Sequence, residues 1–379
     1  MCTLGTPGKP GSPGMSIIDL ARPDIVAMQP YSSARKEAAA QGVLLNANES
    51  PRSLLDGDEA GLALHRYPEP QPAELVKRLA RLYGLPSDHV LVTRGSDEGI
   101  DLLTRVFCRA GVDAILHCPP TFGMYRIAAE TQGAAVVSVP RTAASGFTLD
   151  TAGILAAVSR DQRIRLVFLT SPNNPTGDCV DGTFLGALLQ ATTNRAMVVI
   201  DEAYAEFCAE ASAIALIAEH PQLAVLRTLS KAWAAAGLRC GIVLAQPSVI
   251  GLLQRIIAPY PLASPVITLA LRVLQPDMQL RQQKLLQEIR ENKKLLVSML
   301  DKRSFVLDLW PGEANFVLLR VKHADRLLAH CAHHGVVVRG YAADPALKDC
   351  IRISVGSRQD LAALEQVLDD WALDDWKED

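Results

Sequence analysis

One lysine stands in an apolar stretch of small residues between two predicted strands. Lys231 follows Ser230, and the alanine-rich segment after it leads to Gly237 and Arg239. We expect a short helix here that Gly237 ends in the left-handed conformation, so that the chain doubles back and Arg239 faces the same pocket as Ser230. An amine condenses with an aldehyde, while a hydroxyl and a guanidinium hold a phosphate by charge-assisted hydrogen bonds. The stretch therefore fits a phosphorylated aldehyde such as pyridoxal phosphate, with Lys231 as the covalent anchor.

Polar residues also follow the ends of other predicted strands. Taken alone, the lysine stretch is better explained as a surface lysine beside a helix cap, so these other strand ends carry the argument. Open sheets of parallel strands bind ligands at the carboxyl ends of the strands. The residues found there are Ser96, Asp97, Phe122, Asn174, Asp201 and Tyr204.

Three of these residues suit a flat phosphorylated ring. Ser96 and Asp97 open a predicted helix, whose free N–H groups and dipole favour a phosphate at its N-terminus. Phe122 is an aromatic residue able to cover the ring. An ordinary serine cap and a core phenylalanine explain the same residues when each is considered separately.

The other strand ends supply groups for the ring itself. Asn174 precedes a proline, which keeps it out of the helical region and presents its amide in a fixed turn, although an Asn-Pro turn needs no ligand. Asp201 ends a buried apolar strand, where a carboxylate is unfavourable unless it meets a cation such as a protonated pyridine nitrogen. Tyr204, three residues later, is within reach of a ring oxygen.

The elements that must position these residues alternate between helix and strand. A helix is predicted over 72–83, with Gly84 as its stop. The predicted strands lie at 90–93, 114–117, 136–139, 166–170, 197–200, 225–227 and 241–245. Strands that are apolar throughout and are separated by helices are typical of a mostly parallel sheet covered on both faces. We therefore expect an α/β fold with a large cofactor-binding domain over 62–270.

The rest of the chain is predicted to form a smaller α/β domain and a tail. An arm over 16–61 and the segment 271–379 are expected to make the small domain. The elements predicted there are a helix over 280–300, strands at 305–309, 316–321, 336–339 and 351–355, a helix ending near 334, and a helix over 360–371. Residues 1–15 are rich in proline and glycine and are predicted to be a disordered tail.

Composition excludes several classes of protein. The chain has 379 residues, which is too long for one core, and its net charge of −3 shows no basic stripe for nucleic acid. No apolar run reaches the roughly 18 residues of a membrane span. The eight cysteines are scattered without a disulfide or zinc spacing, so we expect reduced thiols and a cytoplasmic protein.

One group of residues has the spacing of metal ligands. It consists of His330, Cys331, His333 and His334. Polar and cationic residues are favoured at the C-terminus of a helix, which is where this group falls. We therefore expect no metal.

Taken in order, these motifs resemble the pyridoxal-phosphate-dependent aminotransferases of fold type I, and most closely the histidinol-phosphate aminotransferases. The segments that carry the resemblance are 94–100, 120–125, 171–177, 201–204, 229–232, 236–241 and 351–356. The resemblance implies that Lys231 binds the cofactor and moves the proton, and that Asp201 pairs with the pyridine nitrogen. It implies further that Asn174 and Tyr204 bond the ring oxygen and that Phe122 stacks on the ring.

The resemblance also assigns residues to the phosphate and to the substrate. Ser96, Asp97, Ser230 and Arg239 would hold the cofactor phosphate, and Tyr67 would reach the cofactor of a second subunit, which requires a homodimer. The substrate-binding residues it implies are Arg352, Arg339, Tyr31 and Asn48.

The implied reaction transfers an amino group from L-histidinol phosphate to 2-oxoglutarate, in histidine biosynthesis. Relatives that act on aromatic or other amino acids share these motifs, as do threonine-phosphate decarboxylases. A pyridoxal-phosphate-binding regulator of transcription is a more distant alternative, because no DNA-binding segment precedes Ser16.

Overall fold

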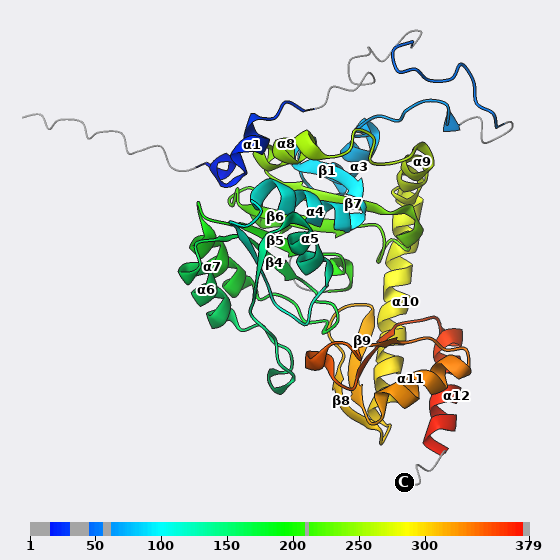
Figure 1. Cartoon of the computed structure of the whole chain (residues 1–379). Coiled ribbons are helices and arrows are strands. Elements are labelled where there is room, and N and C mark those ends of the chain that lie inside the picture. Colours follow the sequence, from blue (N-terminus) through cyan, green and yellow to red (C-terminus); the bar gives the residue numbers. More distant parts are fainter. Residues whose placement is uncertain (1–15, 31–44, 56–61, 209–211, 374–379) are drawn as a thin grey trace, which may run out of the picture.

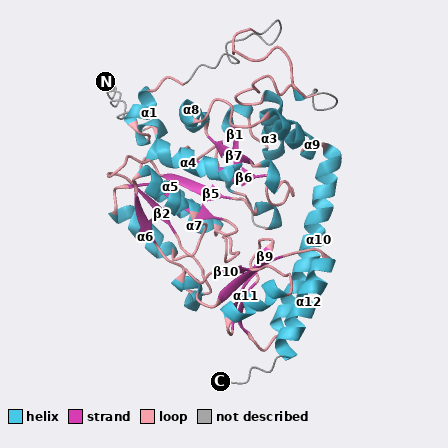
Figure 2. Ribbon diagram, turned by 45° about the vertical axis from the view of Figure 1, so that its right-hand side comes forward, coloured by secondary structure: helices cyan, strands magenta, loops and turns pink. Residues whose placement is uncertain are grey.

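The structure is a computed structural model that describes residues 16–30, 45–55, 62–208 and 212–373 (Figures 1 and 2). It contains two β-sheets, each covered by helices. The predicted tail over residues 1–15 lies outside the described residues, and so does Tyr31.

The larger sheet has seven strands in the order β1-β7-β6-β5-β4-β2-β3. Its strands are β1 (Val90–Arg94), β2 (Ala114–His117), β3 (Ala135–Ser138), β4 (Ile164–Thr170), β5 (Met197–Asp201), β6 (Leu223–Thr228) and β7 (Cys240–Ala245). All neighbouring pairs are parallel except the two that β7 makes with β1 and β6. The predicted α/β fold with a mostly parallel sheet is therefore confirmed, and β7 alone runs against the other strands.

Helices cover both faces of this sheet, as the continuous apolar strands require. One face packs against α4 (Gly95–Phe107), α5 (Met124–Gln132) and α8 (Pro247–Ile256). The other packs against α3 (Ala73–Tyr83), α6 (Thr151–Arg160), α7 (Gly182–Thr192) and α9 (Ser264–Val273). Successive strand residues alternate between the two cores, so that Leu91 enters the first core while Val90 and Val92 enter the second.

The helix predicted over 72–83 illustrates why these elements form where they do. Its apolar residues recur on one face, and Leu75 and Leu79 are fully buried in the structure. The helix α3 ends at Gly84, which has φ 68° and donates its N–H to the carbonyls of Ala80 and Arg81.

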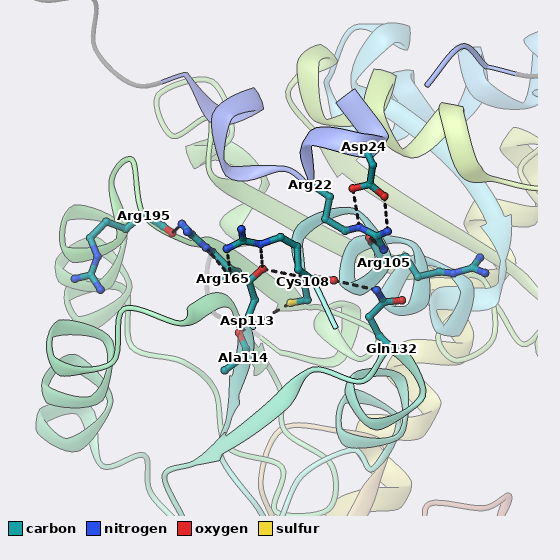
Figure 3. Close-up of polar contacts among 10 residues, drawn as sticks. Arg22, Asp24, Arg105, Cys108, Asp113, Ala114, Gln132, Arg165 and Arg195 are labelled. Carbon is teal, nitrogen blue, oxygen red and sulfur yellow. Dashed lines mark hydrogen bonds and ion pairs between the residues drawn. The ribbon is translucent and has the colours of Figure 1, made fainter. Parts of the chain in front are cut away.

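The N-terminal segment docks on the end of α4. It contains a 3-10 turn (Ile17–Leu20) and α1 (Pro23–Ala27), whose apolar side chains join the core below α8. Arg22 pairs with Asp24 and donates a 3.1 Å hydrogen bond to the carbonyl of Arg105 (Figure 3). In the same region the Gln132 side chain donates a hydrogen bond to the carbonyl of Cys108, and Cys108 is the C-cap residue of α4.

A second sheet follows the long helix α10 (Pro276–Asp301), which runs from the large sheet to the second sheet (Figure 1). Its order is β10-β11-β9-β8, all antiparallel. The strands are β8 (Val306–Trp310), β9 (Phe316–Val321), β10 (Arg339–Gly340) and β11 (Cys350–Ser354), and the sheet packs against α10, α11 (Ala324–His333) and α12 (Arg358–Leu373). The domain boundary near residue 270 stays a prediction.

One predicted strand of the second sheet is wrong. The segment 336–339 was expected to be a strand, but only Arg339 and Gly340 join the ladder, opposite Arg352 and Ile351. Val336 and Val338 pack on the core beneath α11 instead. Their apolar character therefore reflects burial of side chains rather than strand pairing.

Candidate active site

A cavity of about 290 Å³ opens at the edge of the large sheet where six of its seven strands end. Most of the predicted site residues lie in its wall. The lining residues are Ser96, Asp97, Phe122, Thr170, Asn174, Asp201, Ala203, Tyr204, Thr228, Ser230, Lys231, Arg239 and Arg352. The fold thus brings into one site residues as far apart in the sequence as Ser96 and Arg352, which are 256 positions apart.

The reversed direction of β7 explains how Arg239 reaches this edge. Because β7 begins where the other strands end, the residue that precedes it lies beside the cavity. Arg239 itself has the left-handed conformation, with φ 50° and ψ 47°, and Ala234 has φ 50°. Gly237 lies inside a 3-10 turn (Ala236–Leu238) without a positive φ, so its predicted left-handed role is wrong. Ala234 and Arg239 therefore have the left-handed conformation in the segment that leads into β7.

One end of the cavity is an anion cradle, formed by the first turn of α4 and Arg239. The Arg239 Nη2 lies 3.1 Å from Oδ2 of Asp97, and its Nη1 donates a 3.4 Å hydrogen bond to Oγ of Ser230. Gly95 has φ 71°, and a Cβ there would lie 2.6 Å from Nη2 of Arg239. The cradle therefore combines a guanidinium, a hydroxyl and the free N–H groups of a helix start, which together suit a phosphate.

The floor of the cavity holds a buried carboxylate. Asp201 ends β5 and is 3% exposed. The Tyr125 hydroxyl donates a 2.8 Å hydrogen bond to its Oδ2, and the Ala203 N–H donates to its Oδ1 at 3.1 Å. Burial raises the pKa of Asp201 to about 6, although both hydrogen bonds act to lower it. A cation placed here would find a carboxylate already oriented by two donors.

The amine of Lys231 belongs to the wall of the same cavity. Burial lowers the pKa of Lys231, and the nearby guanidinium groups of Arg352 and Arg239 lower it further. Its Nζ lies 5.5 Å from the ring centroid of Tyr204. A lowered pKa increases the fraction of neutral amine, which is the form that attacks a carbonyl and accepts a proton.

Aromatic rings and a second guanidinium complete the wall. Tyr204 packs edge-on against Phe316 of β9, with ring centroids 5.3 Å apart. Arg352 of β11 lies 5.0 Å from the same Phe316 ring and donates a hydrogen bond to Oδ1 of Asn174. Both sheets therefore contribute to the cavity, and Arg352 is the cation that the second sheet supplies.

Three predicted substrate or partner residues lie outside the cavity wall. Arg339 is exposed opposite Arg352 in the second sheet, and both arginines line a neighbouring cleft of about 530 Å³. Tyr67 is 48% exposed and stacks on Tyr260 with ring centroids 4.6 Å apart. Asn48 is exposed with φ 55°. Their roles stay predictions, as does that of Tyr31, which is not among the described residues.

The sequence pattern did not single out Tyr125, Thr170 and Thr228 as site residues. Tyr125 lies in the first turn of α5 and is fully buried, stacked on Phe168 at 4.9 Å. Its hydroxyl also lies 2.7 Å from Oγ1 of Thr170. Phe122 precedes α5 whereas Tyr125 lies in its first turn, so helical spacing does not relate the two, and the sequence carries no local signal for the contact of Tyr125 with Asp201.

The described ranges contain neither a membrane-spanning helix nor a cluster of metal ligands. No helix there is long and apolar enough to cross a membrane. No group of three or more histidine, cysteine and acidic side chains there has the arrangement of a metal site. In the group that has the spacing of metal ligands, Nε2 of His330 lies 3.1 Å from the carbonyl oxygen of Val367, so this histidine connects α11 to α12.

Comparisons with known proteins agree with this geometry. The family model for aminotransferases of class I and II matches residues 37–369. A histidinol-phosphate aminotransferase of Aeromonas salmonicida (strain A449) is 43% identical over 357 residues, which cover 94% of this chain and 99% of the relative. That of Escherichia coli O9:H4 (strain HS) is 41% identical over 346 residues, which cover 91% of this chain and 96% of the relative.

Solved structures give the same picture for the fold. The histidinol-phosphate aminotransferase of Sinorhizobium meliloti, in complex with pyridoxal-5'-phosphate, matches with a TM-score of 0.72 and 25% identity. The match covers 83% of this chain and 86% of that chain.

Proposed function

Since the chain belongs to the aminotransferase class I and II family and is a transaminase that uses pyridoxal phosphate, we propose that its amino donor is L-histidinol phosphate and its acceptor 2-oxoglutarate. The products are imidazole acetol phosphate and L-glutamate, a step of histidine biosynthesis. The observation that carries the proposal is the 41–44% identity to histidinol-phosphate aminotransferases over more than nine-tenths of this chain.

The residues in the cavity fit the cofactor. The cavity wall brings together an amine with a lowered pKa, a cradle for an anion and a buried carboxylate for a cation. We infer that Arg239, Ser230 and the first turn of α4 at Ser96 and Asp97 hold the phosphate, with Asp97 orienting Arg239. When bound, pyridoxal phosphate supplies a ring that accepts the electrons of the substrate's Cα–H bond.

The remaining wall residues have roles around the ring. Asp201 pairs with the pyridine nitrogen, and the Tyr125 hydroxyl keeps the Asp201 carboxylate ionised and oriented. Asn174 and Tyr204 bond the ring oxygen. Phe122 covers one face of the ring.

Lys231 acts first as the anchor of the cofactor and then as the base. With the cofactor bound, Nζ of Lys231 would hold it, and the same amine, once free, would move the proton at Cα of the substrate. Because burial and two guanidinium groups lower the pKa of Lys231, a larger fraction of the amine is neutral than for an exposed lysine.

The substrate end of the site is assigned to arginines and to a second subunit. Arg352 and Arg339 stand opposite each other in neighbouring strands, and a guanidinium accepts either a phosphate or a carboxylate in a bidentate fork. We propose that they serve both substrates, with help from Tyr31 and Asn48. The protein is proposed to be a cytoplasmic homodimer in which the exposed Tyr67 reaches the cofactor of the neighbouring subunit.

The first experiment tests the anchor. The purified holoenzyme is expected to absorb in the visible range because Lys231 is bound to the cofactor, and Lys231→Ala is expected to lose this band. Activity should fall by about 10³-fold or more, since positioned proton transfer alone contributes roughly 10²–10⁴-fold. A colourless wild-type enzyme, or a fully active Lys231→Ala variant, would contradict the assignment.

The second experiment tests the substrate. Half-reaction rates are measured from the change in cofactor absorbance and compared for L-histidinol phosphate, L-phenylalanine and L-threonine phosphate. L-Histidinol phosphate is expected to react with a higher kcat/KM than L-phenylalanine, by at least about 10²-fold, because phenylalanine has no phosphate and leaves the arginines that would bind it unpaired. A faster reaction with phenylalanine, or carbon dioxide release from threonine phosphate, would reassign the substrate.

A further inference from the structure

Two thiols meet beside the active-site cavity. Cys179 lies five residues after Asn174, on the loop that follows β4, and Cys208 lies four residues after Tyr204, on the loop that follows β5. Their Sγ atoms are 2.7 Å apart. A covalent disulfide has an S–S distance of about 2.05 Å, so the structure holds two neighbouring thiols rather than a bond.

This pair differs from the other cysteines of the described ranges. Cys108, Cys118, Cys240, Cys331 and Cys350 are buried, whereas Cys179 and Cys208 are half-buried and therefore accessible to a small oxidant. Accessibility and the proximity of a second thiol are the two features that direct oxidation to a disulfide.

We propose that Cys179 and Cys208 are a site of reversible disulfide formation, with a hydroperoxide or a low-molecular-weight disulfide as the oxidant. With a hydroperoxide, the two S–H bonds break and one S–S bond forms, while two electrons and two protons reduce the peroxide to an alcohol and water. With a small disulfide, the same two electrons and protons yield two small thiols. The reverse reaction with excess dithiol restores both cysteines.

The local backbone holds both thiols in place. On the first loop, Asn173 N–H donates to the Asp178 carbonyl at 2.8 Å, and Gly177 N–H donates to the Asn173 carbonyl at 2.7 Å. On the second loop, Cys208 N–H donates to the Ala205 carbonyl at 3.1 Å, at the end of a 3-10 turn (Ala205–Phe207). The bond would therefore fasten the Asn174 loop to the Tyr204 loop, on either side of the proposed ring oxygen contacts.

Charged and polar groups around the pair set its rate of oxidation. Burial raises the pKa of Cys179, and Cys208 and Glu313 raise it further, whereas a hydrogen bond with Ser171 lowers it. The neighbouring amine of Lys293 has its pKa lowered to about 8, mainly by burial. Because only the thiolate attacks a disulfide, the bond is expected to form slowly at pH 7 and faster as pH rises.

The chain offers a direct way to detect the bond. Arg195 separates Cys179 from Cys208, and no other lysine or arginine lies between Arg165 and Arg227, so trypsin puts each cysteine on its own peptide, 166–195 and 196–227. The holoenzyme is treated with oxidised glutathione at pH 7 and pH 9, free thiols are blocked by alkylation, and the tryptic peptides are measured by mass spectrometry.

The expected result is one linked pair of peptides, 166–195 with 196–227, that forms several-fold faster at pH 9 and disappears with dithiothreitol. Cys179→Ser and Cys208→Ser are expected to abolish the linked pair, and the control Cys331→Ala is expected to retain it. The proposal is overturned if both cysteines of the wild-type protein can still be alkylated, or if each only carries glutathione. This outcome requires neither a folded variant nor an activity measurement.

Discussion

The Tyr125 hydroxyl donates a 2.8 Å hydrogen bond to Oδ2 of Asp201, and both residues are buried. The same hydroxyl contacts Thr170, and the Tyr125 ring stacks on Phe168. The carboxylate that faces the cofactor is thus held by a residue of α5 that itself does not line the cavity. This makes Tyr125 a positioning residue for Asp201.

The first prediction removes that hydroxyl. Tyr125→Phe is expected to lower kcat/KM by about 10-fold or more, because a hydrogen bond to a charged group contributes roughly 1.5–3 kcal/mol. The hydrogen bond lowers the pKa of Asp201, so its loss should also move the acidic limb of the pH–activity profile upward by about one unit. Tyr83→Phe, whose ring lies beside Arg227 rather than at the cavity, is the matched control. An unmoved acidic limb in Tyr125→Phe would reduce Tyr125 to a packing residue.

The second prediction concerns the stability of the cofactor-free protein. Burial raises the pKa of Asp201 from 3.8 to about 6, so the folded state binds this proton more tightly than the unfolded state. Ionisation of Asp201 therefore lowers stability as pH rises from about 4 to about 6, and the loss is complete above that range.

Asp201→Asn tests this sign. The cofactor-free variant is expected to be more stable than wild type at pH 8, by on the order of 2–3 kcal/mol, and equally stable near pH 4. Urea unfolding at the two pH values measures the difference, and cofactor binding should weaken in the same variant. If the cofactor-free variant is less stable than wild type at pH 8, the ionised Asp201 carboxylate does not destabilise the folded state and the prediction is wrong.

The third prediction separates two arginines. Arg352 lines the cavity, whereas Arg339 lies outside it on the neighbouring strand. Arg352→Lys is expected to lower kcat/KM by about 10²-fold in both half-reactions, because lysine cannot form a bidentate fork. Arg339→Lys should have the smaller effect, near 10-fold. Stopped-flow measurement of each half-reaction decides, and a loss confined to one half-reaction in Arg352→Lys would end the proposal of a shared arginine.

The fourth prediction concerns the close contact of β7 with α4. A Cβ at Gly241 would lie 2.1 Å from the Gly95 carbonyl carbon and 2.4 Å from the Ser96 nitrogen. Gly241→Ala should therefore displace the first turn of α4, reduce stability by about 3 kcal/mol and weaken cofactor affinity more than 10-fold.

The matched control for this change is Gly186→Ala in α7, where nothing lies within 4 Å of the added Cβ. It is expected to raise stability by about 0.5–1 kcal/mol, because alanine loses less backbone entropy in a helix. Thermal unfolding and cofactor titration of both variants make the comparison. Normal cofactor affinity in Gly241→Ala would show that the cradle tolerates movement of α4.

The sequence predicted the strands and the residues at their ends well, because a buried parallel strand needs an unbroken apolar run and a polar residue marks its end. Asp201 and Ser96 were found in this way. Tyr125 was missed since its contact with Asp201 depends on how α5 packs against the sheet, which no local pattern records. Gly237 was assigned the left-handed conformation because glycine adopts it most easily, yet the direction of β7 imposes it on Arg239.

The strand predicted at 336–339 failed for a related reason. Apolar residues indicate burial, and burial is shared by paired strands and by loops that pack on a core. Val336 and Val338 belong to the second kind. The roles proposed for Tyr67 and Arg339, which lie outside the cavity, would depend on a second subunit or on the arrangement of the two sheets. Strand periodicity carries no information on either.

The pairing of β1 with β7 has a consequence for the order of folding. It sets Arg94 opposite Cys240, so the cradle between Ser96 and Arg239 forms only after the chain between them has been closed into the sheet. Contacts so distant in sequence pay a large loop-closure entropy and form late. We therefore expect the cofactor to bind a nearly folded protein and to slow unfolding rather than speed folding.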